Sequence, residues 1–286
     1  MTQPPGPSEP AMTAETTMTA ELVEAPGQSS GRPANPWRRL LVAEMVLVLA
    51  VSLGQSAIYS LLTIVERLTR HVALNQQTSS LNQAATPDRP WLSALHQLVN
   101  VVFMFAPAGL ALYLLHAVGR PAAGVRRLLG LDRRRRRFDW AWGFALFAGI
   151  GIPGLALYVG ARELGINTTV QAANLGQYWW TVPLLLMAAL GNSVLEEVVM
   201  VGYLFTRSRQ AGFAPWVVLV ISAVVRGSYH LYQGFGGFIG NLLMGLVFGS
   251  FFLRTRRLWP LVICHFLLDA ASFVGYSLLA GHVSWL

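Results

Sequence analysis

Three short groups of polar residues interrupt the apolar C-terminal half of this chain. Each group contains side chains that can hold a proton, a water molecule or a metal ion. The groups are Asn192-Ser-Val-Leu-Glu196-Glu197, Arg226-Gly-Ser-Tyr-His230 and His265-Phe-Leu-Leu-Asp269. Residues four apart share one face of a helix, so Arg226 is expected to project beside His230. The same spacing predicts that His265 lies beside Asp269.

The two adjacent glutamates are expected to have different partners, because successive residues on a helix point about 100° apart. One carboxylate can face a cavity while the other binds a neighbouring helix. Asn192 precedes Glu196 by one turn on the same face, so it is expected to orient that carboxylate. The structural alternative is a carboxylate pair that only caps a helix or binds an arginine.

The ionisable groups fall at similar depths along their segments. A rise of 1.5 Å per residue places Glu196, His230, His265 and Asp269 within about 10 Å of one another in depth. Two imidazoles and one carboxylate (His230, His265 and Glu196) form a recognised zinc set with one open position. Such an ion lowers the pKa of a bound water to about 7. We therefore expect one divalent metal, most readily zinc, while a metal-free mechanism stays open. A lone histidine in such a segment is more often a hydrogen-bonded core residue.

The elements that must position these groups are membrane-spanning helices. Hydrophobic residues make up 54% of the 286 residues and charged residues only 12%, against about 25% charged in an average soluble domain. A helix needs about 20 apolar residues to cross a bilayer. The sequence predicts an all-α polytopic integral membrane bundle with about seven transmembrane helices, at 40–64, 91–118, 139–160, 178–206, 214–232, 236–253 and 258–280.

Composition also excludes several kinds of site. The one cysteine, Cys264, rules out a disulfide framework within the chain and a multi-cysteine metal site. All 21 basic residues are arginine, so a P-loop lysine and a Schiff-base lysine are impossible. Residues 1–36 are rich in Pro, Thr, Ser and Ala, and we expect a disordered cytoplasmic tail there, followed by a transmembrane domain over 37–286.

Arginine placement predicts the orientation of the chain. Most arginines fall in alternate connections between the apolar segments, which places the N-terminus in the cytoplasm by the positive-inside rule. The net charge of +8 is therefore a topology signal and predicts contact with membrane lipid, with no nucleic acid as partner. Glu44, near the inner end of the first segment, is expected to extend toward the interface. These arginines lie within 32–39, 120–137, 207–209 and 254–257.

In these groups the sequence resembles the CPBP (CAAX protease and bacteriocin-processing, or Abi) family of intramembrane proteases, over about 178–280. The family pattern is EExxxRG, then FxxxH, then HxxxN or HxxxD. Glu196 and Glu197 match the first motif, but Val201 stands where the family has arginine. The second motif matches in His230, with Arg226 in the phenylalanine position. The third matches throughout its polar positions.

The resemblance implies a role for each matched residue. Glu196 would activate the attacking water and Glu197 would support it. His230 and His265 would bind the water or a metal, and Asp269 would stand where the family has an oxyanion-stabilising Asn or Asp. We further expect Arg226 to provide the charge partner for Glu197 that Val201 cannot.

The sequence thus predicts a peptide hydrolase of the cell membrane that cleaves a membrane-proximal bond in a peptide or lipidated peptide. Two alternatives stay open. One is a catalytically inactive relative that serves as an immunity or scaffold protein, and the other is a small proton-coupled transporter. A lysine-free, Arg- and Ala-rich chain is typical of a GC-rich bacterium, and the sequence leaves the oligomeric state undetermined.

Overall fold

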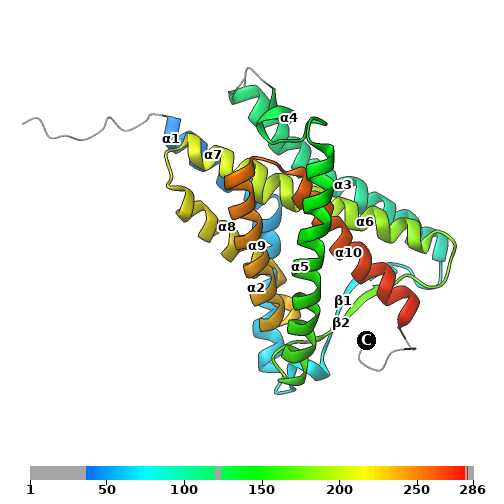
Figure 1. Ribbon diagram of the computed structural model, residues 1–286. Helices are drawn as coiled ribbons and strands as arrows, with labels where there is room; N and C mark the ends of the chain where they lie inside the picture. The colour runs from blue at the N-terminus through cyan, green and yellow to red at the C-terminus, as the bar shows by residue number, and fades with distance from the viewer. Residues whose placement is uncertain (1–36, 120–123, 281, 283–286) are drawn as a thin grey trace, which may run out of the picture. The chain divides into compact units, whose positions relative to one another are not determined.

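The computed structural model describes residues 37–119, 124–280 and 282, which form a bundle of long helices (Figure 1). The predicted tail at 1–36 lies outside the described residues. The helices are α1 (Trp37–Ala50), α2 (Leu53–Thr69), α3 (Pro90–Gly119), α4 (Val125–Leu128), α5 (Arg136–Glu163), α6 (Thr181–Glu196), α7 (Leu204–Gln210), α8 (Pro215–His230), α9 (Phe235–Thr255) and α10 (Trp259–Leu279). A π-helical segment, η2 (Glu197–Tyr203), joins α6 to α7. Short 3-10 turns occur at η1 (Leu74–Gln76) and η3 (Leu231–Gln233).

The predicted all-α polytopic architecture is confirmed, and six of the seven apolar segments contain one helix or a continuous helical series, while 40–64 contains two helices separated by a break. By length and composition, five of the described helical segments can cross a membrane alone, or up to six if a bent pair forms one span. The segment that falls short is α8, whose 16 residues extend about 24 Å against a hydrocarbon core of about 30 Å. The expected count of seven is therefore too high by this measure.

The bent pair is α1 and α2, which meet at 54°. The Ser52 hydroxyl donates to the Val48 carbonyl at 2.6 Å, as happens where a helix is bent or ends. A Cβ on Gly54 would lie 2.7 Å from the Leu49 carbonyl oxygen, so the close approach at the bend requires glycine here. The sequence prediction of one continuous segment over 40–64 missed this break.

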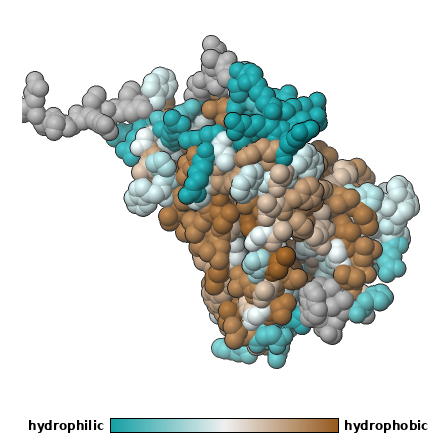
Figure 2. Space-filling model, in the orientation of Figure 1, coloured by the Kyte–Doolittle hydropathy of each residue, from teal (hydrophilic) through white to brown (hydrophobic). Residues whose placement is uncertain are grey.

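The arginine-rich connections gather at one end of the bundle. The Leu258 backbone N–H donates to the Leu129 carbonyl at 2.9 Å, which joins the α9–α10 connection to the α4–α5 connection. The Arg38 guanidinium lies 5.1 Å from the centre of the Phe213 ring, beside the α7–α8 connection. Figure 2 shows hydrophilic residues gathered at this end, with a broad hydrophobic surface over the adjoining helices.

The other connections carry a small sheet that the sequence analysis did not predict. Strand β1 (Thr78–Gln83) pairs in parallel with β2 (Thr169–Asn174), in the register Thr78 to Thr169. The buried Asn82 amide holds the strands together by donating to the Ala172 carbonyl at 3.0 Å. The sheet fastens the connection after α2 to the connection after α5.

The central helix of the bundle is the α6–η2–α7 series. Of the residues in its most apolar stretch, 67% are buried. The corresponding share in α5 is 6%, so α5 presents its apolar surface outward. Polar groups on the central series are therefore shielded, whereas the outer helices supply the lipid-like surface. Every residue of η2 is buried, and its first residue is Glu197.

Candidate active site

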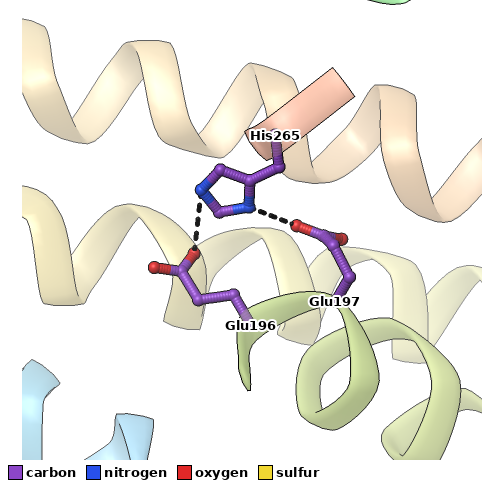
Figure 3. A group of neighbouring side chains, drawn as sticks. All are labelled: Glu196, Glu197 and His265. Carbon is purple, nitrogen blue, oxygen red and sulfur yellow. Dashed lines mark hydrogen bonds and ion pairs between the residues drawn. The ribbon is translucent and has the colours of Figure 1, made fainter. Parts of the chain in front are cut away.

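The centre of the candidate site is the imidazole of His265, which lies between two carboxylates (Figure 3). Glu196 ends α6, Glu197 begins η2, and His265 comes from α10. The His265 Nδ1 atom lies 2.7 Å from Glu197 Oε1, and its Nε2 atom lies 4.0 Å from Glu196 Oε2. Because adjacent residues on a helix diverge by about 100°, a flat ring inserted between them meets one carboxylate on each side.

This geometry fixes which nitrogen of His265 is free. An ionised carboxylate only accepts hydrogen bonds, so Nδ1–H donates to Glu197. In the neutral ring Nε2 is then an acceptor, and it faces Glu196 and also Asp269 Oδ1, which lies 3.7 Å away. A carboxylate that holds one imidazole nitrogen and leaves the other free is the usual way a protein orients a histidine toward a water or metal.

Arg226 neutralises the carboxylate behind His265. Its Nη2 atom lies 2.5 Å from Glu197 Oε1 and 3.8 Å from Glu196 Oε2. The guanidinium is almost completely buried and lies 5.3 Å from the centre of the Phe248 ring. The predicted pairing of Arg226 with Glu197 is confirmed, while Val201 packs as an ordinary core residue with 1% exposure.

Tyr229 is a site residue that the sequence analysis missed. Its hydroxyl donates to Glu196 Oε2 at 2.6 Å, so it holds the carboxylate that faces His265. The signal was present in the spacing, because Tyr229 follows Arg226 by three residues and such pairs share a helix face.

The expectation that Asn192 orients Glu196 is wrong. The Asn192 amide instead donates to Asp269 Oδ2 at 3.1 Å, across the contact between α6 and α10. The packing of α10 against α6 brings the Asp269 carboxylate within hydrogen-bond distance of Asn192, and this contact takes the place of one along its own helix. The Asp269 side chain keeps 20% exposure whereas that of Glu197 has none, so the cluster is most accessible at Asp269.

His230 lies beside the cluster and is not part of its closest group. Its Nδ1–H donates to the Arg226 carbonyl at 3.1 Å, and its ring centre lies 4.7 Å from that of Tyr229. Within the described residues, the donor atoms that lie within 4.8 Å of one another belong to Glu196, Glu197 and His265. The predicted metal set of His230, His265 and Glu196 is thus brought together only in its last two members.

Two buried polar atoms at the site have no hydrogen-bond partner among the described residues: Glu197 Oε2 and Arg226 Nη1. Leaving such an atom unsatisfied costs about 1–3 kcal/mol, and more for a charged group. They mark a place where the side chains are arranged for a group that the protein itself does not supply.

The donor set fits a divalent metal. One imidazole nitrogen and carboxylate oxygens are zinc ligands, and the carboxylates of Glu196, Glu197 and Asp269 outnumber the one guanidinium that faces them. The cluster with neutral His265 carries a net charge of −2, so a divalent ion would balance it, whereas protonation of His265 would leave one negative charge. Both remain compatible with these contacts.

Away from the site, Glu44 does not extend to the interface as expected. It accepts hydrogen bonds from Arg207 Nε at 2.7 Å and from the Tyr203 hydroxyl at 2.8 Å. Arg207, assigned to an inner connection by its charge, is fully buried. A buried guanidinium is tolerated when its donors are satisfied, and no sequence-local signal connects Arg207 to an acid in the first helix.

Comparison with known families supports the motif reading. Residues 178–271 match the family described as Rce1-like, type II CAAX prenyl endopeptidase Rce1-like. No curated protein and no solved structure matches the chain. The match covers the three polar groups of the site and nearly the same residues as the CPBP resemblance, which it confirms. The chain is thus a multi-pass helical membrane protein, and its residues 178–271 match the model of the Rce1-like family of type II CAAX prenyl endopeptidases.

Proposed function

We propose that this protein is an intramembrane endopeptidase that hydrolyses a peptide bond with water activated by Glu196. The observation that carries the proposal is the arrangement of Glu196 opposite the free Nε2 of His265, at 4.0 Å. That separation allows one water molecule to contact both atoms at about 2.8 Å each. Tyr229 and Glu197 then hold the two reacting partners in place, which is the arrangement that general-base catalysis requires.

In the reaction, Glu196 takes a proton from the water while the water oxygen bonds to the carbonyl carbon of the substrate. The carbonyl oxygen gains negative charge, which the positive charge of the buried Arg226 guanidinium, 3.8 Å from Glu196 Oε2, stabilises electrostatically. The C–N bond then breaks, and the proton held by Glu196 passes to the leaving amine. His265 orients the water throughout, and Asp269 orients water at the accessible side.

We also propose a divalent metal, zinc, as a cofactor. His265 Nε2, Glu196 and Asp269 would hold it, with His230 Nε2 as a further candidate. Zinc, when bound, lowers the pKa of an attached water to about 7 and stabilises negative charge on oxygen. A cluster without metal, in which a protonated His265 offsets one of the two excess negative charges, is the competing form.

The substrates that fit the family description are prenylated peptides cleaved near their C-terminus. We extend this class to the chain, together with other membrane-embedded peptides. We place the N-terminus and the arginine-rich connections in the cytoplasm, by the positive-inside rule, and assign the chain to a bacterial cell membrane.

The test compares two glutamate variants in purified protein reconstituted in lipid nanodiscs, with a panel of quenched fluorogenic peptides, farnesylated and unmodified. Glu196→Gln should lower kcat/KM by about a thousandfold, the range of a lost general base. Glu44→Gln removes a carboxylate of similar burial outside the site and should keep kcat/KM near the parent value. Equal cleavage by Glu196→Gln and the parent would refute the proposal. Absence of cleavage by the parent on every peptide would favour the inactive relative.

Metal content is tested separately by elemental analysis. The parent should carry about one zinc per chain and His265→Ala should lose it, whereas the exposed His96→Ala should retain it. A parent without zinc after growth in zinc-supplemented medium, yet still active, would leave the glutamate mechanism intact and remove the metal.

A further inference from the structure

A second binding feature lies away from the active site, in an open groove between α5 and α9. Its volume is about 550 Å³. Three aromatic rings form much of its surface: Phe138 and Trp142 from α5, and Phe251 from α9. The Trp142 and Phe251 ring centres are 5.5 Å apart, and those of Phe138 and Phe251 are 6.3 Å apart. Leu246 and Val247 complete the apolar part, and Ser250 also lines the groove.

The groove has a charged end. Arg254, exposed and in the last turn of α9, lines it on the side of the arginine-rich connections. Along α9 the lining runs from Leu246 to Thr255, which is about 14 Å and therefore close to the depth of one leaflet of a 30 Å core.

The nearby acids are already engaged. Asp132 and Asp139 both bind Arg257, at 2.7 Å and 2.5 Å. Among the residues that the structure describes, no ion pair involves Arg254 or the exposed run 133–137. Among the described residues, this end of the protein therefore carries guanidinium groups in excess of the carboxylates that pair with them, which leaves Arg254 able to bind an anion.

We propose that this groove binds one anionic phospholipid, with an acyl chain against the aromatic rings and the phosphate on Arg254. The apolar length matches one leaflet, the aromatic rings lie where aromatic residues anchor to an interface, and the unpaired arginines favour a headgroup of net negative charge. No residue of the candidate active site lines the groove: the fully buried Phe248 lies against Arg226, whereas Val247 and Phe251 line the groove. The inference does not rest on the proposed proteolysis.

The test counts bound lipid by native mass spectrometry of the full chain, with phosphatidylglycerol and phosphatidylcholine of the same acyl chains. The parent should retain one phosphatidylglycerol in preference to phosphatidylcholine. Arg254→Gln should weaken that binding about fivefold, since one arginine near an anionic surface contributes about 1 kcal/mol. Ser250→Phe should fill the groove and abolish retention. Arg89→Gln, an exposed arginine in the connection before α3, is the matched control and should bind like the parent.

A second measurement tests the proposal on the parent protein, in case a groove variant fails to fold. Phosphatidylglycerol brominated on its acyl chains should quench the fluorescence of Trp142. The Trp142 signal is the difference in fluorescence between the parent and Trp142→Phe. Equal retention of the two lipids, or unchanged binding by Arg254→Gln, would overturn the proposal. Displacement of phosphatidylglycerol by a farnesylated peptide would also overturn it, because the groove would then hold a substrate lipid.

Discussion

The protein contains two buried clusters of the same three residue types, and they differ in how completely they are satisfied. In one, Arg207 and Tyr203 both bind Glu44. In the other, Arg226 binds Glu197 and Tyr229 binds the adjacent Glu196. Both guanidiniums are almost completely buried.

The first cluster is closed. Besides Glu44, Arg207 donates from Nη1 to Gln210 and from Nη2 to the Leu114 carbonyl, each at 2.6 Å. It thereby joins α1, α3 and α7. No buried polar atom of this cluster lacks a partner within the described part of the chain.

The second cluster is open, because Glu197 Oε2 and Arg226 Nη1 have no hydrogen-bond partner among the described residues. In addition, Glu196 Oε2 lies 4.0 Å from His265 Nε2, which is too far for a direct hydrogen bond. The same residue types thus form one cluster whose polar atoms are all paired and one that keeps unpaired atoms beside the proposed site. Burial and charge alone do not distinguish the two, but the count of satisfied atoms does.

The largest effect that would test this contrast is on stability. Arg207→Met leaves Glu44 buried without its cation, and breaking such a pair costs about 3–5 kcal/mol. The free energy of unfolding in mixed micelles should fall by that amount, while kcat/KM per folded molecule stays at the parent value. A large loss of kcat/KM in the folded fraction would contradict the division between the clusters.

Removing the ion pair of Arg226 and Glu197 in the open cluster should lower activity and leave stability nearly unchanged. Arg226→Met combined with Glu197→Gln removes both charges together, so stability should change little, whereas kcat/KM should fall about a hundredfold because His265 and the transition-state charge lose their supports. Circular dichroism melts measure the stability, and peptide cleavage measures kcat/KM.

The position of the guanidinium gives a further test. In an Arg226→Phe protein, adding Val201→Arg restores the family motif and should recover at least part of the activity. No recovery would show that the position of the guanidinium matters beyond its charge.

The two tyrosines give a smaller, matched comparison. Tyr229→Phe removes one hydrogen bond to Glu196 and should lower kcat about tenfold, in line with about 1.5–3 kcal/mol for a hydrogen bond to a charged group. Tyr203→Phe removes the equivalent bond to Glu44 and should leave kcat unchanged. Similar kcat values for the two variants would remove Tyr229 from the site.

The smallest effect concerns a third arginine, Arg257, at the arginine-rich end. Its hydrogen bond lowers the pKa of Asp132 below the usual value, and a backbone N–H from Arg134 adds to this. A lowered pKa in the folded state stabilises the protein above the unfolded-state pKa of about 4, and this contribution is lost as pH falls through the lower value. Asp132→Asn should therefore melt earlier than the parent at pH 7, and the difference should vanish in acid. A difference that stays constant from pH 7 to below pH 4 would refute the ion-pair interpretation.

Sequence reasoning reached the helices and much of the site because those features repeat locally. Apolar runs identify the spans, spacing along one helix places Arg226 beside His230, and the missing motif arginine at Val201 predicts the pairing of Arg226 with Glu197. The contacts that it missed run between distant parts of the chain. Arg207 on α7 binds Glu44 on α1, and Asn192 on α6 binds Asp269 on α10. A residue's own helix face gives its direction, but the identity of its neighbour depends on how the helices pack.

The parallel sheet has a consequence for the order in which the chain assembles. Parallel strands cannot form a local hairpin, and β1 is separated from β2 by α3 and α5. During synthesis β1 therefore emerges well before its partner exists, and Asn82 must wait for the Ala172 carbonyl. Contacts between such distant segments form slowly because a long loop must close first. The connections opposite the arginine-rich end should consequently become ordered late, after the third apolar segment has been inserted.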